Sequence, residues 1–176
     1  MAIKIGAKAP GFELPGVDGR NHSLAGLADK EAVVVIITCN HCPVAVAYED
    51  RMIQIQADYA GRGVQLVAIC SNNAATHPAD SFEAMKKRAA EKGFNFPYLR
   101  DETQEVARAY GAAVTPEVFV VDKAGSVVYH GRIDDNTAEP AKVKRPDLRE
   151  ALDELLAGKP ISVKNTEPVG CTVKWK

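Results

Sequence analysis

The chain has 176 residues, with 22 lysines and arginines against 23 aspartates and glutamates and a formal net charge of -1. Its 46% hydrophobic and 26% charged residues exclude a disordered, collagen-like or coiled-coil chain. The balanced charge argues against nucleic acid as a partner, and the longest apolar run, 32–37, is too short to cross a membrane. We therefore predict one domain over residues 1–176, with a C-terminal tail at 161–176 packed on it.

Cysteine usage narrows the class of protein further. The four cysteines, Cys39, Cys42, Cys70 and Cys171, are too few and too unevenly spaced for a disulfide scaffold. The first six residues lack the apolar stretch of a secretory signal, so we expect a cytoplasmic protein. In that reducing compartment, thiols are more often catalytic, metal-binding or buried than paired in structural disulfides.

The first half of the chain predicts a hairpin followed by a βαβ unit. Residues 10–31 alternate short apolar pieces with turn residues, which is typical of a hairpin. Residues 32–38 are apolar and β-branched almost throughout, as in a strand buried on both faces. A helix with apolar residues at helical spacing follows over 43–60, and a second apolar strand covers 64–70. A strand, a helix and a strand in this order form a right-handed unit with parallel strands.

The second half predicts three more helices and a β-hairpin. In chain order we expect a helix from Pro78 to Gly93, an extended piece at 94–99, a helix between Asp101 and Gly111, strands at 118–121 and 126–130, and a helix over 146–158. Asp101 and Gln104 have the spacing of a capping box at the start of their helix. Elements in this order form a mixed sheet with helices on both faces.

The sequence Cys39-Asn40-His41-Cys42 lies between the first buried strand and the helix of the βαβ unit. The free amides and the dipole of a helix N-terminus favour a thiolate, which lowers a cysteine pKa from about 8.5 to roughly 3.5–7.5. We expect Cys39, at the exposed end, to be the nucleophile and Cys42 to resolve its mixed disulfide. His41 adds positive charge beside Cys39 and makes the couple more oxidising.

Two other interpretations of this pair compete with redox chemistry. A structural zinc site needs about four ligands, and the chain has no second CxxC motif and no paired histidines. Two inert core cysteines are also possible, but a strand-to-helix boundary is an unusual place for them. Redox chemistry is therefore the favoured interpretation, and a zinc-binding or protein-binding module stays open as an alternative.

The same residues carry a resemblance to a known family. The run 33–43 entering a helix, with Thr115-Pro116 before a hairpin, resembles the thioredoxin fold. The lead-in at 6–15, followed by Asp18-Gly19 and Ser23-Leu24, resembles the redoxin branch. That branch unites the alkyl hydroperoxide reductase/thiol-specific antioxidant proteins with thioredoxin-like thiol-disulfide reductases. The resemblance covers about the first 158 residues, and the Cys-Asn-His-Cys-Pro motif is similar to that of a thiol-disulfide isomerase group.

The resemblance implies a thioredoxin-like α/β fold, in which helices flank a central mixed sheet, with an N-terminal β-hairpin and a redoxin-type insertion. It assigns the nucleophile to Cys39 and the resolving thiol to Cys42. Asn40, His41 and Pro43 become supporting residues. Thr115 matches the residue whose backbone pairs with an incoming peptide, and Pro116 matches the cis-proline that faces the active site.

The implied activity is that of a dithiol–disulfide oxidoreductase that reduces, oxidises or isomerises disulfides. Its only redox group is the Cys39–Cys42 disulfide, without cofactor or metal. Its substrates are protein or small-molecule disulfides, and a partner reductase or oxidant exchanges electrons with it. Val33 replaces the buried aspartate that thioredoxins use for proton transfer, so the proton acceptor stays open.

A thiol-dependent peroxidase with an antioxidant role is the alternative enzyme. Peroxiredoxins carry a threonine three residues before the peroxidatic cysteine, where its hydroxyl binds peroxide. The corresponding residue is Ile36 for Cys39, and it is Cys39 itself for Cys42. Neither side chain supplies that hydroxyl, so peroxidase activity ranks second.

Cys70 and Cys171 are candidate accessory thiols. Cys70 ends the strand expected beside the one that leads to Cys39, although burial in the core is the more common state of a free cysteine. Cys171 lies in a tail that holds the only tryptophan, Trp175. Burial of Trp175 would tie the tail to the domain. Either Cys171 is then a passenger, or Gly170 lets it approach Cys39 or Cys42 closely enough to act as a third redox thiol.

Overall fold

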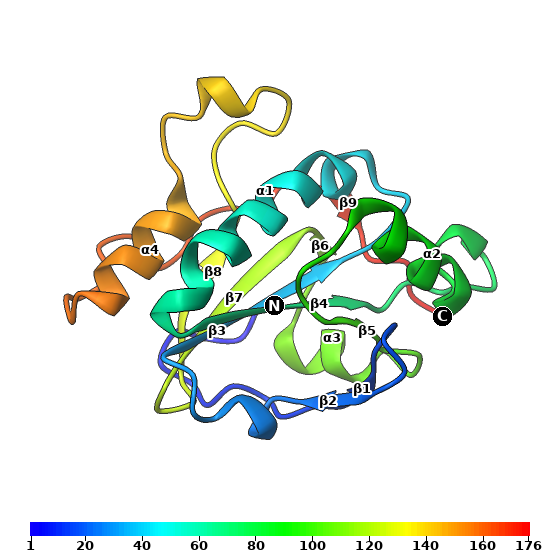
Figure 1. Cartoon of the computed structure of the whole chain (residues 1–176), viewed down its shortest axis with the longest axis horizontal. Coiled ribbons are helices and arrows are strands. Elements are labelled where there is room, and N and C mark those ends of the chain that lie inside the picture. The colour runs from blue at the N-terminus through cyan, green and yellow to red at the C-terminus, as the bar shows by residue number, and fades with distance from the viewer.

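A five-stranded mixed sheet with helices on both faces forms the centre of the structure, a computed structural model that describes residues 1–176 (Figure 1). The strands are β1 (Glu13–Pro15), β2 (Asn21–Ser23), β3 (Ala32–Thr38), β4 (Val64–Cys70), β5 (Tyr98–Arg100), β6 (Val114–Thr115), β7 (Glu117–Asp122), β8 (Val127–Gly131) and β9 (Cys171–Thr172). The α-helices are α1 (Pro43–Tyr59), α2 (Phe82–Lys92), α3 (Glu105–Tyr110) and α4 (Asp147–Leu156). Short 3-10 helices are η1 (Ala25–Leu27), η2 (Ala60–Arg62), η3 (Pro78–Asp80) and η4 (Pro140–Lys142).

The strand order β5-β4-β3-β7-β8 confirms the predicted βαβ unit and the predicted hairpin. Strands β3 and β4 are parallel, with Thr38 opposite Cys70, and α1 connects them. Strand β7 runs antiparallel to β3 on its other side, and β8 pairs with β7. The extended piece expected at 94–99 is β5, parallel to β4. The lead-in forms the hairpin of β1 and β2.

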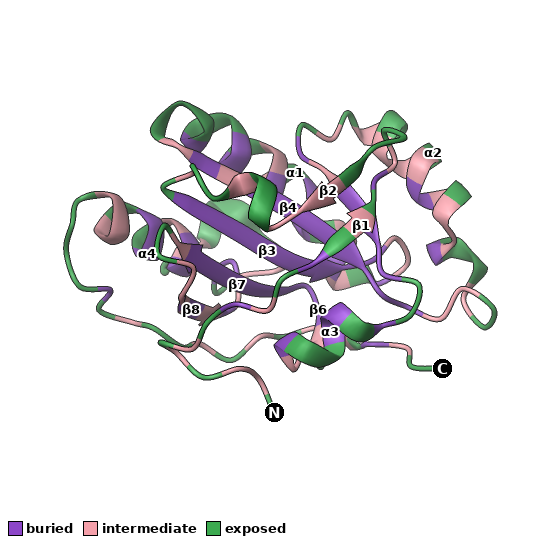
Figure 2. Ribbon diagram, turned by 90° about the horizontal axis from the view of Figure 1, so that it is seen from below, coloured by how far each residue is buried: buried purple, intermediate pink, exposed green.

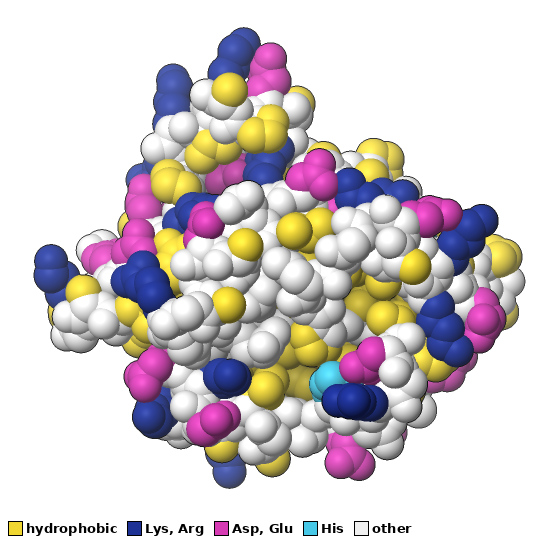
Figure 3. All heavy atoms as spheres, viewed as in Figure 1, with side chains coloured by type: hydrophobic (Ala, Val, Ile, Leu, Met, Phe, Trp, Pro, Cys, Tyr) yellow, Lys and Arg dark blue, Asp and Glu magenta, His cyan; other side chains and the backbone are white.

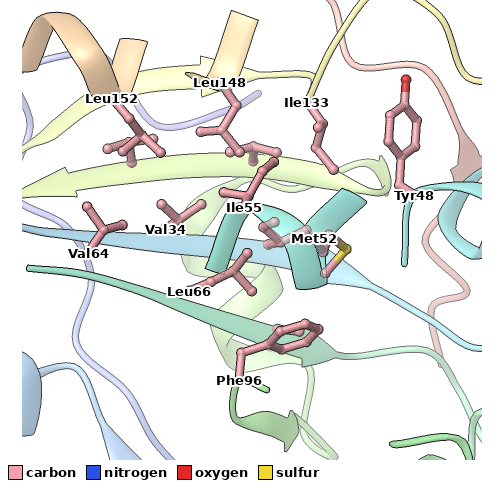
Figure 4. Close-up of a cluster of buried hydrophobic side chains, with 14 of the residues drawn as sticks. Val34, Tyr48, Met52, Ile55, Val64, Leu66, Phe96, Ile133, Leu148 and Leu152 are labelled. Atoms are coloured by element: carbon pink, nitrogen blue, oxygen red, sulfur yellow. The ribbon is translucent and has the colours of Figure 1, made fainter. Parts of the chain in front are cut away.

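Strand β3 is buried along its whole length, as its apolar sequence predicts (Figure 2). Val34 and Ile36 point to the face covered by α1 and α4, where they join a cluster of 25 buried residues. Figure 4 shows part of that cluster, to which α1 contributes Met52, α4 contributes Leu148 and β3 contributes Val34. This shared core packs α1 against the sheet and so positions the start of α1 next to the end of β3.

The opposite face of the sheet carries a second core. Val33, Val35 and Ile37 of β3 join a cluster of 16 buried residues, which includes Tyr110 of α3. Helix α3 and the N-terminal segment cover this face, and the Tyr110 hydroxyl donates to the Pro10 carbonyl at 2.7 Å. Burial on both faces makes β3 the central strand of the sheet.

The start of α3 differs from the predicted capping box. Gln104 takes a left-handed conformation, with φ of 67°, and its side chain donates to the carbonyls of Ser71 and Lys174. Asp101 still caps the helix, because its carboxylate accepts from the amide of Ala107 at 3.0 Å. The capping box is wrong because Gln104 finds partners outside the helix, which a local pattern does not contain.

The C-terminal tail lies on the domain through β9, which pairs antiparallel with β6. Val173, 3% exposed, is the tail residue that enters the core, whereas Trp175 is 38% exposed and lies against the Arg108 guanidinium, 4.4 Å from its ring centroid. The expectation that Trp175 anchors the tail by burial is therefore wrong. Val173, two residues earlier, is the side chain that anchors the tail by burial.

Positive and negative side chains are intermingled on the face of the molecule that Figure 3 shows. None of the helices is both long enough and apolar enough to span a membrane. A loop that includes η4 projects away from the helical layer, near the start of α4 (Figure 1).

The two-sided burial of β3 predicts an unusual pattern of sensitivity along one strand. Ile36→Ala and Ile37→Ala, neighbours on opposite faces, should each lower the free energy of unfolding by about 2–5 kcal/mol, because each leaves a cavity in a packed core. Urea unfolding measures this change. Val169→Ala, at a position 61% exposed, is the control and should stay within about 0.5 kcal/mol of the parent. If Ile37→Ala behaved like that control, the second core would be absent.

Candidate functional site

The Cys39-Asn40-His41-Cys42 segment joins the end of β3 to the start of α1. Cys42 is the N-cap residue of α1, and Pro43 occupies the first helical turn. Proline suits that position because its fixed φ matches a helix and the first turn leaves amides unpaired in any case. The sequence thus ends a buried strand and begins a helix within a few residues, and both sulfurs lie at the carboxyl edge of the sheet, where ligand sites of α/β folds occur.

Cys39 is buried, with 2% of its surface exposed. Burial raises the pKa of the Cys39 thiol to about 11, and the Asp80 carboxylate adds to that effect, while a hydrogen bond with Thr115 acts against it. The expectation of an exposed Cys39 with a low pKa is therefore wrong for this conformation. Cys39 precedes the helix by a few residues, and Thr115 from a neighbouring strand lies against its sulfur.

Cys42 is the thiol that lies on the helix N-terminus. Burial raises the pKa of Cys42, but hydrogen bonds with the Cys171 side chain and with the amides of Ala45 and Cys171 outweigh it, so the pKa of Cys42 is lowered. The pKa of Cys171 is raised, chiefly by the same hydrogen bond with Cys42 and then by burial. The contact between the two sulfurs thus shifts the pKa values of Cys42 and Cys171 in opposite directions.

Thr115 touches both sulfurs of the motif. Its hydroxyl lies 3.5 Å from the Cys39 sulfur, and its carbonyl oxygen accepts from Cys42, also at 3.5 Å. The peptide bond between Thr115 and Pro116 is cis. This bond joins β6 to β7, which lies beside β3 in the sheet, so the threonine is carried to the motif by a neighbouring strand.

Asp80, which the sequence analysis did not single out, is the buried carboxylate of the site. It is fully buried in η3 and accepts from the amide of Asn40 at 2.7 Å, from the Asn72 side chain at 2.9 Å and from Nδ1 of His41. The His41 ring also stacks on His77, with centroids 5.0 Å apart. Asp80 thus pairs with the ring of His41, and the expected effect of His41 on the redox couple stays a prediction.

A buried polar network supports this carboxylate. The Arg100 guanidinium, 3% exposed, donates to the carbonyls of Asp80 and Asn72 at 3.1 and 2.7 Å. The Tyr98 hydroxyl donates to the side-chain oxygen of Asn40 at 2.8 Å. Buried polar groups are stable only when they find partners, and these residues satisfy one another. Both Tyr98 and Arg100 come from β5, whose parallel pairing with β4 delivers them to the same edge.

The two candidate accessory thiols have different surroundings. Cys70 ends β4 and is fully buried, and burial raises the pKa of its thiol to about 12, which is typical of an inert core cysteine. Cys171 is half-buried in β9, with its sulfur 2.6 Å from that of Cys42. The structure therefore brings Cys39, Cys42 and Cys171 together around Thr115.

Cys39, His41 and Asp80 are also side chains of the kinds that bind metals, and their ligand atoms lie within 4.8 Å of one another. Both oxygens of Asp80, however, already accept hydrogen bonds from the protein. These hydrogen bonds are also those of a histidine–carboxylate pair that lies beside a thiol and binds no metal. The expectation that the site holds no metal stays a prediction.

The surroundings of Cys39 predict how Asp80 acts on its pKa. Asp80→Asn removes a negative charge while it keeps the shape of the side chain, so the pKa of Cys39 should fall below about 11. Thiolate absorbance followed against pH in a Cys42→Ser, Cys70→Ser, Cys171→Ser background isolates this one group. Asp147→Asn, a buried carboxylate paired with Arg132 and Arg145, is the matched control. An unchanged Cys39 pKa in Asp80→Asn would show that burial alone raises it.

Solved structures with the same architecture include proteins of unassigned function. An uncharacterised conserved protein from Geobacillus kaustophilus is 42% identical, with a TM-score of 0.93, and the match covers 98% of this chain and 93% of that one. A thiol:disulfide interchange protein of the thioredoxin family from Chlorobium tepidum is 24% identical, with a TM-score of 0.65 over 89% of this chain and 98% of that one. The similarity confirms the thioredoxin-like fold.

Curated relatives connect the chain to thiol redox chemistry. The thiol-disulfide oxidoreductase ResA of Geobacillus thermodenitrificans is 27% identical over 128 residues, 72% of this chain and 68% of the relative. A protein of Mycobacterium tuberculosis named as a peroxiredoxin is 28% identical over 156 residues, 80% of this chain and 92% of the relative. The Redoxin family profile matches residues 4–152. A cysteine motif at the sheet edge, a thioredoxin-like fold and this match agree, and the chain belongs to the Redoxin family.

Proposed function

We propose that the protein is a thiol–disulfide oxidoreductase that works through a Cys39–Cys42 dithiol/disulfide couple. The observation that carries the proposal is the position of the pair, at the junction of β3 and α1, with both sulfurs in contact with Thr115. The two cysteines are three residues apart, with Cys42 as the N-cap of α1, a spacing at which a disulfide can close. The similarity to ResA supports the same chemistry.

The reaction needs two exchange steps. The Cys39 thiolate attacks a substrate disulfide, which forms a mixed disulfide and releases one substrate thiol. The Cys42 thiolate then attacks the Cys39 sulfur, which closes the Cys39–Cys42 disulfide and releases the second substrate thiol. Two electrons pass to the substrate, and a partner reductase restores the dithiol. In the opposite direction, with a partner oxidant, the same steps oxidise or isomerise a substrate.

The pair of His41 and Asp80 is placed to move the proton of this chemistry. Cys39 prefers its protonated form, because burial raises the pKa of its thiol, so a base must take the proton before attack. The ring of His41 is 26% exposed, and Asp80 orients it through Nδ1. A buried carboxylate that orients an imidazole is a common arrangement for general bases. Asp80, acting through His41, would thereby serve in proton transfer in place of the buried aspartate that Val33 replaces.

The substrate class follows from the chemistry of the couple. A dithiol exchanges with protein or small-molecule disulfides and needs no cofactor or metal of its own. We place the protein in a reducing, cytoplasmic compartment and expect neither nucleic acid nor a membrane as a partner.

Single substitutions of the cysteines test the proposal. Reduction of insulin by dithiothreitol should be accelerated by the wild type, and Cys39→Ser and Cys42→Ser should each fall to the uncatalysed rate. Cys70→Ser is the matched control and should keep the wild-type rate, since Cys70 is fully buried in the core. In addition, Cys42→Ser should accumulate mixed disulfides, because its resolving thiol is missing. Full activity in Cys39→Ser would contradict the assigned nucleophile.

A thiol-dependent peroxidase is the second candidate, favoured by the similarity to the Mycobacterium tuberculosis relative. Ile36, three residues before Cys39, is fully buried in β3 and offers no hydroxyl to a peroxide. Peroxide consumption with a dithiol donor separates the two activities. We expect none above the background, whereas consumption that survives in Cys42→Ser and disappears in Cys39→Ser would support the peroxidase.

A further inference from the structure

We propose that Cys171 is a third redox thiol, which forms a disulfide with Cys42 by exchange with the Cys39–Cys42 disulfide. The proposal deepens the function proposed above and rests on it. The sulfurs of Cys42 and Cys171 lie 2.6 Å apart, about half an ångström more than the length of a disulfide bond, roughly 2.05 Å. The two residues are separated by 129 positions in the sequence, so the tertiary fold alone brings them together.

Backbone pairing sets the position of the Cys171 sulfur. In the antiparallel ladder of β6 and β9, Thr115 lies opposite Cys171 and Val114 opposite Thr172. Thr115 is the residue that touches Cys39 and Cys42, so the ladder directs the tail cysteine to the same point. Strand β9 thus pairs with β6 as an added strand, in the way that extended peptides bind to a free sheet edge.

The tail is held beyond Cys171 by specific contacts. Val173 is buried, and its amide donates to the carbonyl of Ala113 at 2.9 Å. The amide of Lys174 donates to the Asn72 side chain, and the Lys174 carbonyl accepts from the Asn73 amide, both at 2.8 Å. Asn72 also donates to Asp80, so one residue holds both the tail and the carboxylate of the site.

Gly170 permits the close approach of the tail to the site. A Cβ atom at this position would lie 1.9 Å from the carbonyl oxygen of Thr115, a backbone atom that cannot rotate away. Any other residue would therefore push the chain away from Thr115, and the sulfur of Cys171 with it. This requirement explains a glycine immediately before the cysteine.

The exchange step balances without any external reagent. The Cys171 thiolate attacks the Cys42 sulfur of the Cys39–Cys42 disulfide, one sulfur–sulfur bond breaks and one forms, and Cys39 leaves. The proton of Cys171 goes to Cys39. The number of disulfides is unchanged, and only their location moves. An oxidant of the proposed function, such as a substrate disulfide, forms the first disulfide.

The Cys42–Cys171 disulfide would lie nearer to solvent than the Cys39–Cys42 disulfide. Cys39 is 2% exposed and Cys42 is fully buried, whereas Cys171 is half-buried. Both sulfurs of the Cys39–Cys42 couple are therefore less accessible to an external thiol than the sulfur of Cys171 is. Transfer to Cys171 moves one sulfur of the disulfide to the surface, where an external thiol can attack it. The tail thereby connects the buried couple with its electron donor.

Disulfide mapping of the full chain tests the proposal. The reduced protein is oxidised with glutathione disulfide, quenched with acid, alkylated and digested with trypsin. Cys39 and Cys42 share the tryptic peptide 31–51, and Cys171 lies in peptide 165–174. We expect these two peptides to be cross-linked in the wild type, and the cross-link to be lost in Cys42→Ser. A wild type that holds only the internal 31–51 disulfide, with Cys171 alkylated, would overturn the proposal.

A glycine variant tests the geometry with all four cysteines present. Gly170→Ala should lose the cross-link and hold the disulfide within peptide 31–51, because its Cβ displaces the tail. Gly61→Ala is the matched control, since a Cβ there meets nothing within 4 Å, and it should keep the cross-link. A cross-link retained in Gly170→Ala at the wild-type level would contradict the role of the β6–β9 ladder.

The insulin assay separates this inference from the function on which it rests. If Cys39→Ser and Cys42→Ser lose insulin reduction but the wild type never forms the cross-link, Cys171 is a passenger and the oxidoreductase stands. If the cross-link forms but the wild type does not accelerate insulin reduction, the sulfur contact is real and the proposed function fails.

Discussion

The burial of β3 on both faces is the constraint on which the site depends. A strand with apolar side chains on both sides must lie in the middle of the sheet, with helices above and below it. All seven residues of β3 are buried, and the chain leaves the sheet directly after Thr38. Cys39 therefore emerges at the carboxyl edge between β4 and β7. Those neighbours then decide what surrounds it, because β4 leads to Asp80 and β7 is preceded by Thr115.

The electrostatics of the site follow from that burial. A thiolate at Cys39 loses its hydration and lies near the carboxylate of Asp80, so the pKa of Cys39 is raised. Cys42 is buried as well, yet hydrogen bonds with Cys171 and with the amide of Ala45 in α1 lower its pKa. The pKa values of these two cysteines thus differ because their sulfurs have different neighbours. Exposure alone does not separate them, because neither is exposed.

The tail closes the site by the same means that build the rest of the fold. A short antiparallel ladder, one buried valine and a set of backbone hydrogen bonds hold β9 against β6. Such a short ladder depends on its anchors at Val173, which is buried, and at Lys174, which is hydrogen-bonded to Asn72 and Asn73.

Part of the fold and of the site is encoded in local patterns of the sequence. The apolar run at 32–38, the helix after it and the CxxC motif at their junction can be read from neighbouring residues, and the resemblance at Thr115-Pro116 added the strand opposite the motif. The burial of Cys39, the position of Asp80 within 4.8 Å of it and the contact of Cys171 with Cys42 depend instead on the tertiary fold. Asn40 and Asp80 are 40 residues apart, and Cys42 and Cys171 are 129 apart. No periodicity links such positions, because the sheet order and the path of the tail bring them together, and burial is a property of everything packed around a side chain.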